Sequence, residues 1–147
     1  MTRHFHRRFH ETLDSTNEWP STLSYWRQYG AESFDARRIA EVVACVARIS
    51  STIPDWRKAI DGDAAAAIGI VLPQPRPEKF TIRVDLPMTV LLNCAFHDAA
   101  AALVLSNRLM QMPLSEGHRT NLSTSWLVHK IWLDHKRTRP NWTWSAS

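Results

Sequence analysis

The stretch PMTVLLNCAFHDAAAALVL, residues 87–105, is the longest apolar run in the 147-residue chain and decides its fold. Its length and its alanines predict a helix that continues to Met112 and stops at Pro113, because proline does not continue a helix. Six of its polar residues fall on one narrow edge of the helical wheel, namely Thr89, Asn93, His97, Asn107, Arg108 and Gln111. A helix that is apolar on its other sides sits centrally in a bundle. We therefore expect a mainly α, single-domain bundle of about five helices around a central helix at 87–112.

The segments before this run predict the surrounding helices. Residues 20–30 open with Pro20 and Ser21 and end at a glycine, as a short helix does. Residues 33–50 form the clearest amphipathic helix in the sequence. A short helix follows, with Thr52 as a cap and Pro54 and Asp55 in its first turn. The core-facing arc of helix 33–50 consists of Ile39, Val42, Val43, Val46, Ala47 and Ile49.

One β-hairpin at 67–86 is a second possibility beside the helices. Residues 67–72, AIGIVL, fit either a buried strand or the end of an alanine-rich helix. Three prolines make residues 73–77 a rigid loop. Alternating apolar and polar residues over 80–86 are typical of a half-buried strand. A single hairpin needs a helical layer to be stable, so helices dominate in either case.

Composition limits the class of protein. Hydrophobic residues make up 44% of the chain and charged residues 22%, a normal globular balance. Asn93, His97 and Asp98 interrupt the long apolar run, which argues against a membrane span. Cys45 and Cys94 each lie in apolar surroundings, as buried thiols in a reducing compartment do. We expect a cytoplasmic protein with no membrane partner.

The formal net charge of +4 is concentrated near the two ends of the chain. Residues 1–18 are polar and predict a mobile basic arm, followed by a helical domain at 19–139 and a tail at 140–147. Two basic ends on a slightly acidic body suit an anionic partner such as nucleic acid, although they also serve simple solubility. The candidate nucleic-acid-binding residues are Arg3, Arg7, Arg8, Arg119, Lys130, Lys136, Arg137 and Arg139.

The last helix, from Ser115 or Asn121 to about Pro140, has two apolar stripes on roughly opposite sides. The first stripe contains Leu127, Val128, Ile131 and Trp132. The second contains Leu122, Trp126 and Leu133. One stripe must face the core, and the other faces the C-terminal tail or a second subunit. We assign the interface to the second stripe and to the tail tryptophans; its candidate residues are Leu122, Trp126, Leu133, Trp142 and Trp144.

Few residues predict chemistry. His4, His6 and His10 have a metal-capable spacing, but the arginines between them repel a cation, so we expect no metal and no cofactor. Asp98 falls among apolar positions of the central helix and therefore needs a partner, which could be a basic side chain, a tryptophan N–H or a helix N-terminus. His97 and Cys94 lie one turn apart, which leaves a minor enzyme hypothesis open.

Two function classes remain. The first is a non-catalytic interaction or adaptor protein, self-associating through helix-packing surfaces; its seven tryptophans exceed what one small core needs. The alternative is a nucleic-acid-binding accessory protein that uses the basic arm and the basic last helix. Against this alternative, the basic residues of the last helix are divided between two narrow edges instead of sharing one face.

Overall fold

The computed structural model describes residues 19–53 and 56–138, and over these ranges the regular structure is helical throughout. The mainly α prediction is thus confirmed. The elements in chain order are η2 (Ser21–Arg27), η3 (Ala31–Ser33), α2 (Ala36–Thr52), α3 (Arg57–Ile60), α4 (Ala64–Val71), α5 (Ile82–Ala95), α6 (Ala99–Leu109) and α7 (Glu116–Thr138).

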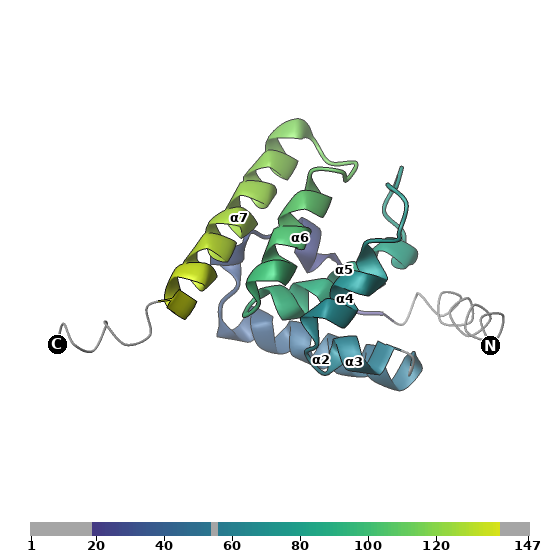
Figure 1. The fold of residues 1–147 in the computed structure, drawn as a ribbon. Coiled ribbons are helices and arrows are strands. Elements are labelled where there is room, and N and C mark those ends of the chain that lie inside the picture. Colours follow the sequence, from purple (N-terminus) through teal and green to yellow (C-terminus); the bar gives the residue numbers. More distant parts are fainter. Residues whose placement is uncertain (1–18, 54–55, 139–147) are drawn as a thin grey trace.

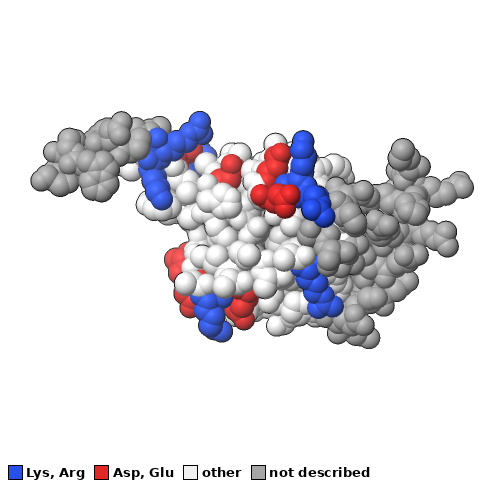
Figure 2. Space-filling model, turned by 90° about the horizontal axis from the view of Figure 1, so that it is seen from below, with Lys and Arg blue, Asp and Glu red and all other residues white. Residues whose placement is uncertain are grey.

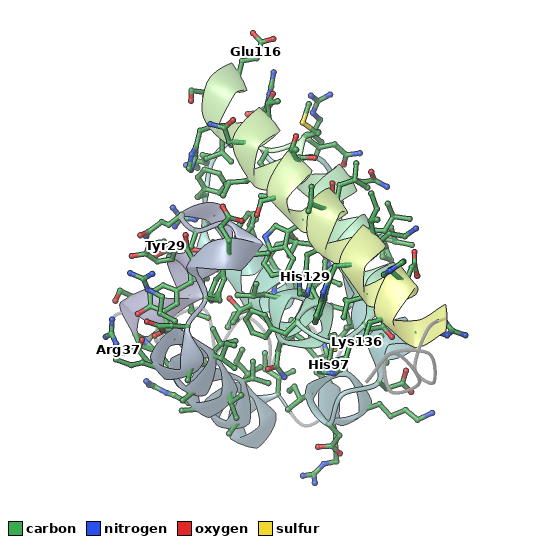
Figure 3. All side chains as sticks on the ribbon, turned by 90° about the vertical axis from the view of Figure 1, so that its left-hand side faces the viewer. Tyr29, Arg37, His97, Glu116, His129 and Lys136 are labelled. Atoms are coloured by element: carbon green, nitrogen blue, oxygen red, sulfur yellow. The ribbon has the colours of Figure 1, made fainter. Side chains whose placement is uncertain are left out.

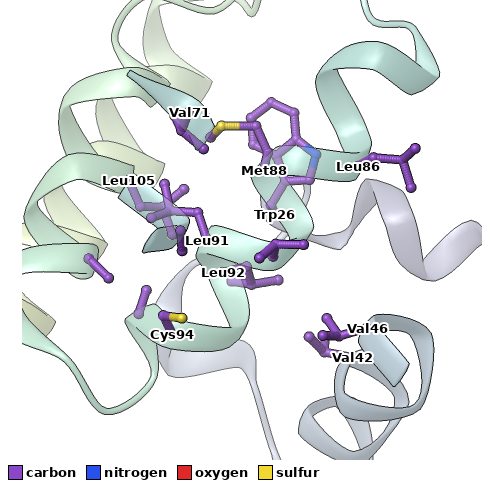
Figure 4. Packing of buried hydrophobic residues seen from close by; sticks show 14 of the residues in the cluster. Trp26, Val42, Val46, Val71, Leu86, Met88, Leu91, Leu92, Cys94 and Leu105 are labelled. Carbon is purple, nitrogen blue, oxygen red and sulfur yellow. The ribbon is translucent and has the colours of Figure 1, made fainter. Parts of the chain in front are cut away.

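Helices α5 and α6 lie in the middle of the molecule (Figure 1). Helix α7 packs along α6, and α6 packs on α5. Helix α5 also contacts α4, α2 and η2. In the view of Figure 1, α2 and α3 run beneath the other helices, and α7 forms the left-hand flank. The single core extends from Leu23 in η2 to Trp126 in α7. Figure 4 shows part of it, with Trp26 beside Met88 and with Leu91 and Leu105 meeting between α5 and α6.

The single central helix expected at 87–112 is wrong, because the chain breaks between Ala95 and Ala99. The Cys94 carbonyl accepts the N–H groups of both His97 and Asp98, which closes the end of α5. Asp98 then adopts an extended conformation and accepts the Ala101 N–H at 2.9 Å as the N-cap of α6. Aspartate before a run of alanines is a strong start signal, and here it divides one apolar run into two helices.

The β-hairpin considered for 67–86 is also absent, since Ala64–Val71 and Ile82–Ala95 are both helical. Asp63 caps α4 by accepting the Ala66 N–H at 3.1 Å. The alternation over 80–86 does not mark a strand: Phe80 and Thr81 precede α5, and the helix is then buried on all sides from Asp85 to Leu92. In such a helix the apolar pattern carries no period of its own, so a short alternation is coincidental.

The helix predicted at 33–50 is confirmed as α2, with Asp35 as its cap. Its buried face is narrower than predicted, because Val43 is 51% exposed and Ala47 is also exposed. The short helix predicted to start at 20–21 is a 3₁₀ helix, η2. Pro54 and Asp55, expected in the next helix, lie outside the described residues, and α3 begins at Arg57.

Asp85 is a buried carboxylate, whereas the strand considered for 80–86 would have pointed it toward solvent. It accepts the Trp26 Nε1–H at 2.9 Å and two N–H groups of Arg27, from Nε at 3.0 Å and from Nη2 at 3.1 Å. These bonds join η2 to the first turn of α5. A buried charge is tolerated when it is paired and hydrogen-bonded in this way.

Candidate interaction surface on helix α7

Helix α7 spans Glu116–Thr138, which confirms the earlier of the two starts considered. Ser115 accepts the His118 N–H on its Oγ at 3.3 Å, as an N-cap does. In Figure 3 the helix crosses the front of the molecule, so one side of it faces the core and the other faces outward.

The second stripe of α7 faces the core, which corrects the interface assignment of Leu122, Trp126 and Leu133. Trp126 is fully buried, Leu122 is 4% exposed, and Leu133 is partly buried against the core. Phe34 and Phe96 each place a ring centroid 6.0 Å from that of Trp126. These aromatic partners come from the loop after η3 and from the α5–α6 turn, which a helical wheel of α7 cannot show.

The first stripe is therefore the one that faces solvent. Leu127 is 41% exposed, Val128 60%, Ile131 57% and Trp132 51%. Because these residues follow an i, i+1, i+4, i+5 pattern, they form one contiguous apolar strip over two turns. We call these four residues the outer stripe. Isolated exposed apolar residues are ordinary, whereas a contiguous patch of large ones marks an interaction site.

Trp132 is held in place within the outer stripe. The His129 ring stacks on it with the centroids 5.7 Å apart, and the Lys136 ammonium lies 5.0 Å above its ring. His129 is fixed in turn, because its Nε2 lies 2.9 Å from the Phe96 carbonyl oxygen. A half-exposed tryptophan with a fixed orientation loses little entropy when a partner covers it.

A depression of about 490 Å³ adjoins this tryptophan, where the end of α7 passes the α5–α6 turn. Figure 3 shows His97 and Lys136 near one another at this end of α7. The depression brings together candidate residues that the sequence treated as separate groups: His97 and Asp98 from the α5–α6 turn, and Leu133, Lys136 and Arg137 from α7. Arg119 lies near the other end of α7, and Lys130 forms a 2.6 Å ion pair with Asp134. The other candidates, Arg3, Arg7, Arg8, Arg139, Trp142 and Trp144, lie outside the described residues.

The surroundings of His97, Asp98 and Cys94 do not support the enzyme hypothesis. His97 is exposed, and the Asp98 carboxylate is used as a helix cap. The Cys94 thiol donates to the Ala59 carbonyl at 3.7 Å instead of to an imidazole. Burial, together with the charges of Asp98 and Asp63, raises the pKa of Cys94 to about 11, so the thiol stays protonated at neutral pH. Across 19–53 and 56–138, no three His, Cys, Asp or Glu side chains gather as a metal site would require.

Charges are interspersed over the face of the molecule shown in Figure 2. Among the described residues on this face, acidic and basic side chains are mixed around a broad uncharged centre and form no continuous basic surface. None of the described helices combines the length and the apolar character needed to cross a membrane. Comparison with models of known protein families, with curated proteins and with solved structures finds no match.

Proposed function

We propose that this protein is a non-catalytic interaction protein that self-associates by packing the outer stripe of α7 against the same stripe of a second copy. The observation that carries this proposal is the outer stripe itself, four large apolar side chains exposed side by side on the longest helix. Exposed apolar rows of this kind on a helix are typically covered by a second helix.

Charge favours an antiparallel pair over a parallel one. The C-terminal half of α7 has excess positive charge from Lys136 and Arg137, whereas in the N-terminal half Glu116 balances Arg119. A parallel pair would place the two basic ends side by side, and the like charges would repel. An antiparallel pair, with its two-fold axis near the middle of the outer stripe, sets each basic end against the neutral half of the partner. Such an isologous arrangement also closes the assembly at two copies.

The nucleic-acid alternative has less support from the described residues. Lys130 is paired with Asp134, and Lys136 lies over Trp132, so two of the nominated cations already have partners within α7. Two free, buried thiols, Cys45 and Cys94, remain consistent with the expected cytoplasmic location.

Sedimentation velocity over a wide range of protein concentration tests the proposal. We expect a monomer–dimer equilibrium that Ile131→Lys abolishes, because the substitution places a charge in the centre of the outer stripe. Val43→Lys is the matched control: Val43 is similarly exposed, at 51%, but lies on α2. A protein that remains monomeric at all concentrations would overturn the proposal, as would a dimer that Ile131→Lys leaves intact. Binding of a labelled oligonucleotide that falls steeply with salt, in a monomeric protein, would favour the alternative.

A further inference from the structure

A pocket of about 460 Å³ lies on the other side of the molecule from the outer stripe. It forms where the end of α4, the proline-rich loop after it, the first turns of α5 and the end of α6 meet. In Figure 1 this loop rises at the right of the molecule, while α7 lies at the left. The walls of the pocket are largely apolar and include Val71, Val84, Pro87, Met88 and Met112. Ligand pockets of small organic molecules have this size and this character.

Arg108 places a buried positive charge in this apolar wall. The residue is only 8% exposed, yet within the described residues no carboxylate lies within ion-pair distance of it. Nη1 donates to the Gln111 Oε1 at 3.0 Å, and Nη2 reaches the Pro75 carbonyl at 3.5 Å, the outer limit of a hydrogen bond. The buried Nε has no acceptor among these residues. A guanidinium has five N–H donors, so most of its hydrogen-bonding capacity is unused.

The burial of this charge is not offset by a counter-ion. Burial lowers the pKa of the Arg108 guanidinium, since no anion offsets the loss of water. Removing a charge from water without pairing it is unfavourable, and folded proteins normally avoid it. The arrangement is explained if the missing anion is a bound ligand.

The first turn of α5 adds a second attraction for an anion at the same pocket. Thr81, Arg83 and Val84 line the pocket at the N-terminus of this 14-residue helix. Thr81 occupies the N-cap position, but its side chain makes no capping hydrogen bond. The N–H groups of a helix N-terminus attract negative charge, and in α5 the Asp85 carboxylate of the same turn, which is paired with Arg27, supplies only part of it. Lys79 also lines the pocket, opposed there by one exposed acid, Glu78.

We propose that this pocket binds a small organic carboxylate with an apolar body. The carboxylate pairs with Arg108, and the apolar body packs against Met88, Met112 and Val84. One guanidinium balances one negative charge, and its planar fork matches a carboxylate in a bidentate arrangement. An inorganic anion would satisfy Arg108 but would leave the apolar walls uncovered, so the pocket favours an amphipathic acid.

Isothermal titration calorimetry with decanoate tests this proposal. We expect saturable binding of one decanoate per chain and at least tenfold weaker binding of decanol, which has the same tail without the charge. Inorganic phosphate should bind no better than decanol. Equal affinity for decanoate and decanol, or decanoate uptake without saturation, would overturn the proposal.

Substitutions then locate the site. Arg108→Met should weaken decanoate binding at least tenfold while leaving the melting temperature unchanged or higher, because it removes an uncompensated buried charge. Arg76→Met is the matched control: Arg76 is exposed on the same loop and bonds to the Gln111 carbonyl, but does not line the pocket. If Arg108→Met fails to fold, Val84→Trp provides an independent test by filling the pocket without touching the charge. Undiminished decanoate binding in Arg108→Met, or in a folded Val84→Trp, would refute the assignment.

Discussion

Replacing Asp85 by alanine should destabilise this protein more than any other single loss of a carboxylate among its described ion pairs. The Asp85 side chain is 11% exposed and accepts three hydrogen bonds, one from Trp26 and two from Arg27. Its removal leaves the fully buried Trp26 N–H without an acceptor, which costs about 1–3 kcal/mol. It also leaves the Arg27 guanidinium without its counter-ion.

The Arg27 contribution is limited by exposure. Breaking a fully buried ion pair costs about 3–5 kcal/mol, but the Arg27 side chain is 25% exposed and stacks 4.4 Å over the Phe80 ring. Water and the ring retain part of its stabilisation. We therefore expect Asp85→Ala to lower the free energy of unfolding by about 3 kcal/mol in total. For a chain of this size that loss lowers the melting temperature by roughly 10 °C.

Urea unfolding followed by tryptophan fluorescence measures the change. Asp85→Asn should lower the free energy of unfolding by only about half as much as Asp85→Ala, because the amide oxygen still accepts the Trp26 N–H. Asp134→Ala is the control, since it removes the acid of the exposed Lys130–Asp134 pair and should cost less than about 1 kcal/mol. If Asp85→Ala and Asp134→Ala lower the free energy of unfolding equally, the hydrogen bonds of Asp85 to Trp26 and Arg27 do not stabilise the fold.

The remaining predictions concern Asp98, Gly30 and the two thiols. Asp98→Ala should cost about 1 kcal/mol in urea unfolding, the value of a helix cap, and a loss near 3 kcal/mol would require a buried pairing instead. Gly30→Ala should weaken the packing of η3 on α7, because an added Cβ would lie 2.7 Å from the Ser125 Oγ. The Ala31 N–H donates to that oxygen, so its hydrogen-exchange rate should increase in the variant. Iodoacetamide should leave Cys45 and Cys94 unmodified in the native state at pH 7, since burial raises the pKa of both to about 11, and rapid labelling would contradict this.

The sequence predicted the helices that have both a clear period and a clear start. The amphipathic pattern placed α2 at 33–50, close to its observed Ala36–Thr52, and α7 begins next to Ser115, the earlier of the two starts considered. The helices without a period were the difficult ones. Helix α5 is buried on all sides from Asp85 to Leu92, so burial does not impose a helical period on these residues. The break before α6 was nevertheless readable, since Asp98 followed by four alanines is a typical helix start.

The sequence assigned the candidate surface to the stripe of α7 that the structure buries. Both stripes of α7 are apolar, and the choice between them depends on where Phe34 and Phe96 lie in space. These residues are 92 and 30 positions before Trp126 in the chain, so no local pattern contains the information. Arg108 was missed for a related reason: on the wheel it belongs to a polar edge, and its burial depends on the proline loop that folds over it.

Asp85 and Arg108 are both buried charged residues, but they differ in how many hydrogen-bond partners the protein provides. Both residues are 8% exposed, so the fold buries most of each side chain. It surrounds Asp85 with three donors from η2, whereas it gives Arg108 one good acceptor and one marginal acceptor. The Trp126 Nε1–H and the Arg119 Nε–H also lack acceptors among the described residues, but the indole is neutral, and Arg119 is only half-buried and lies outside this pocket. The pairing of Asp85 shows that this fold can provide partners for a buried charge. The unused donors of Arg108 in the wall of a pocket therefore indicate a partner that comes from outside the chain.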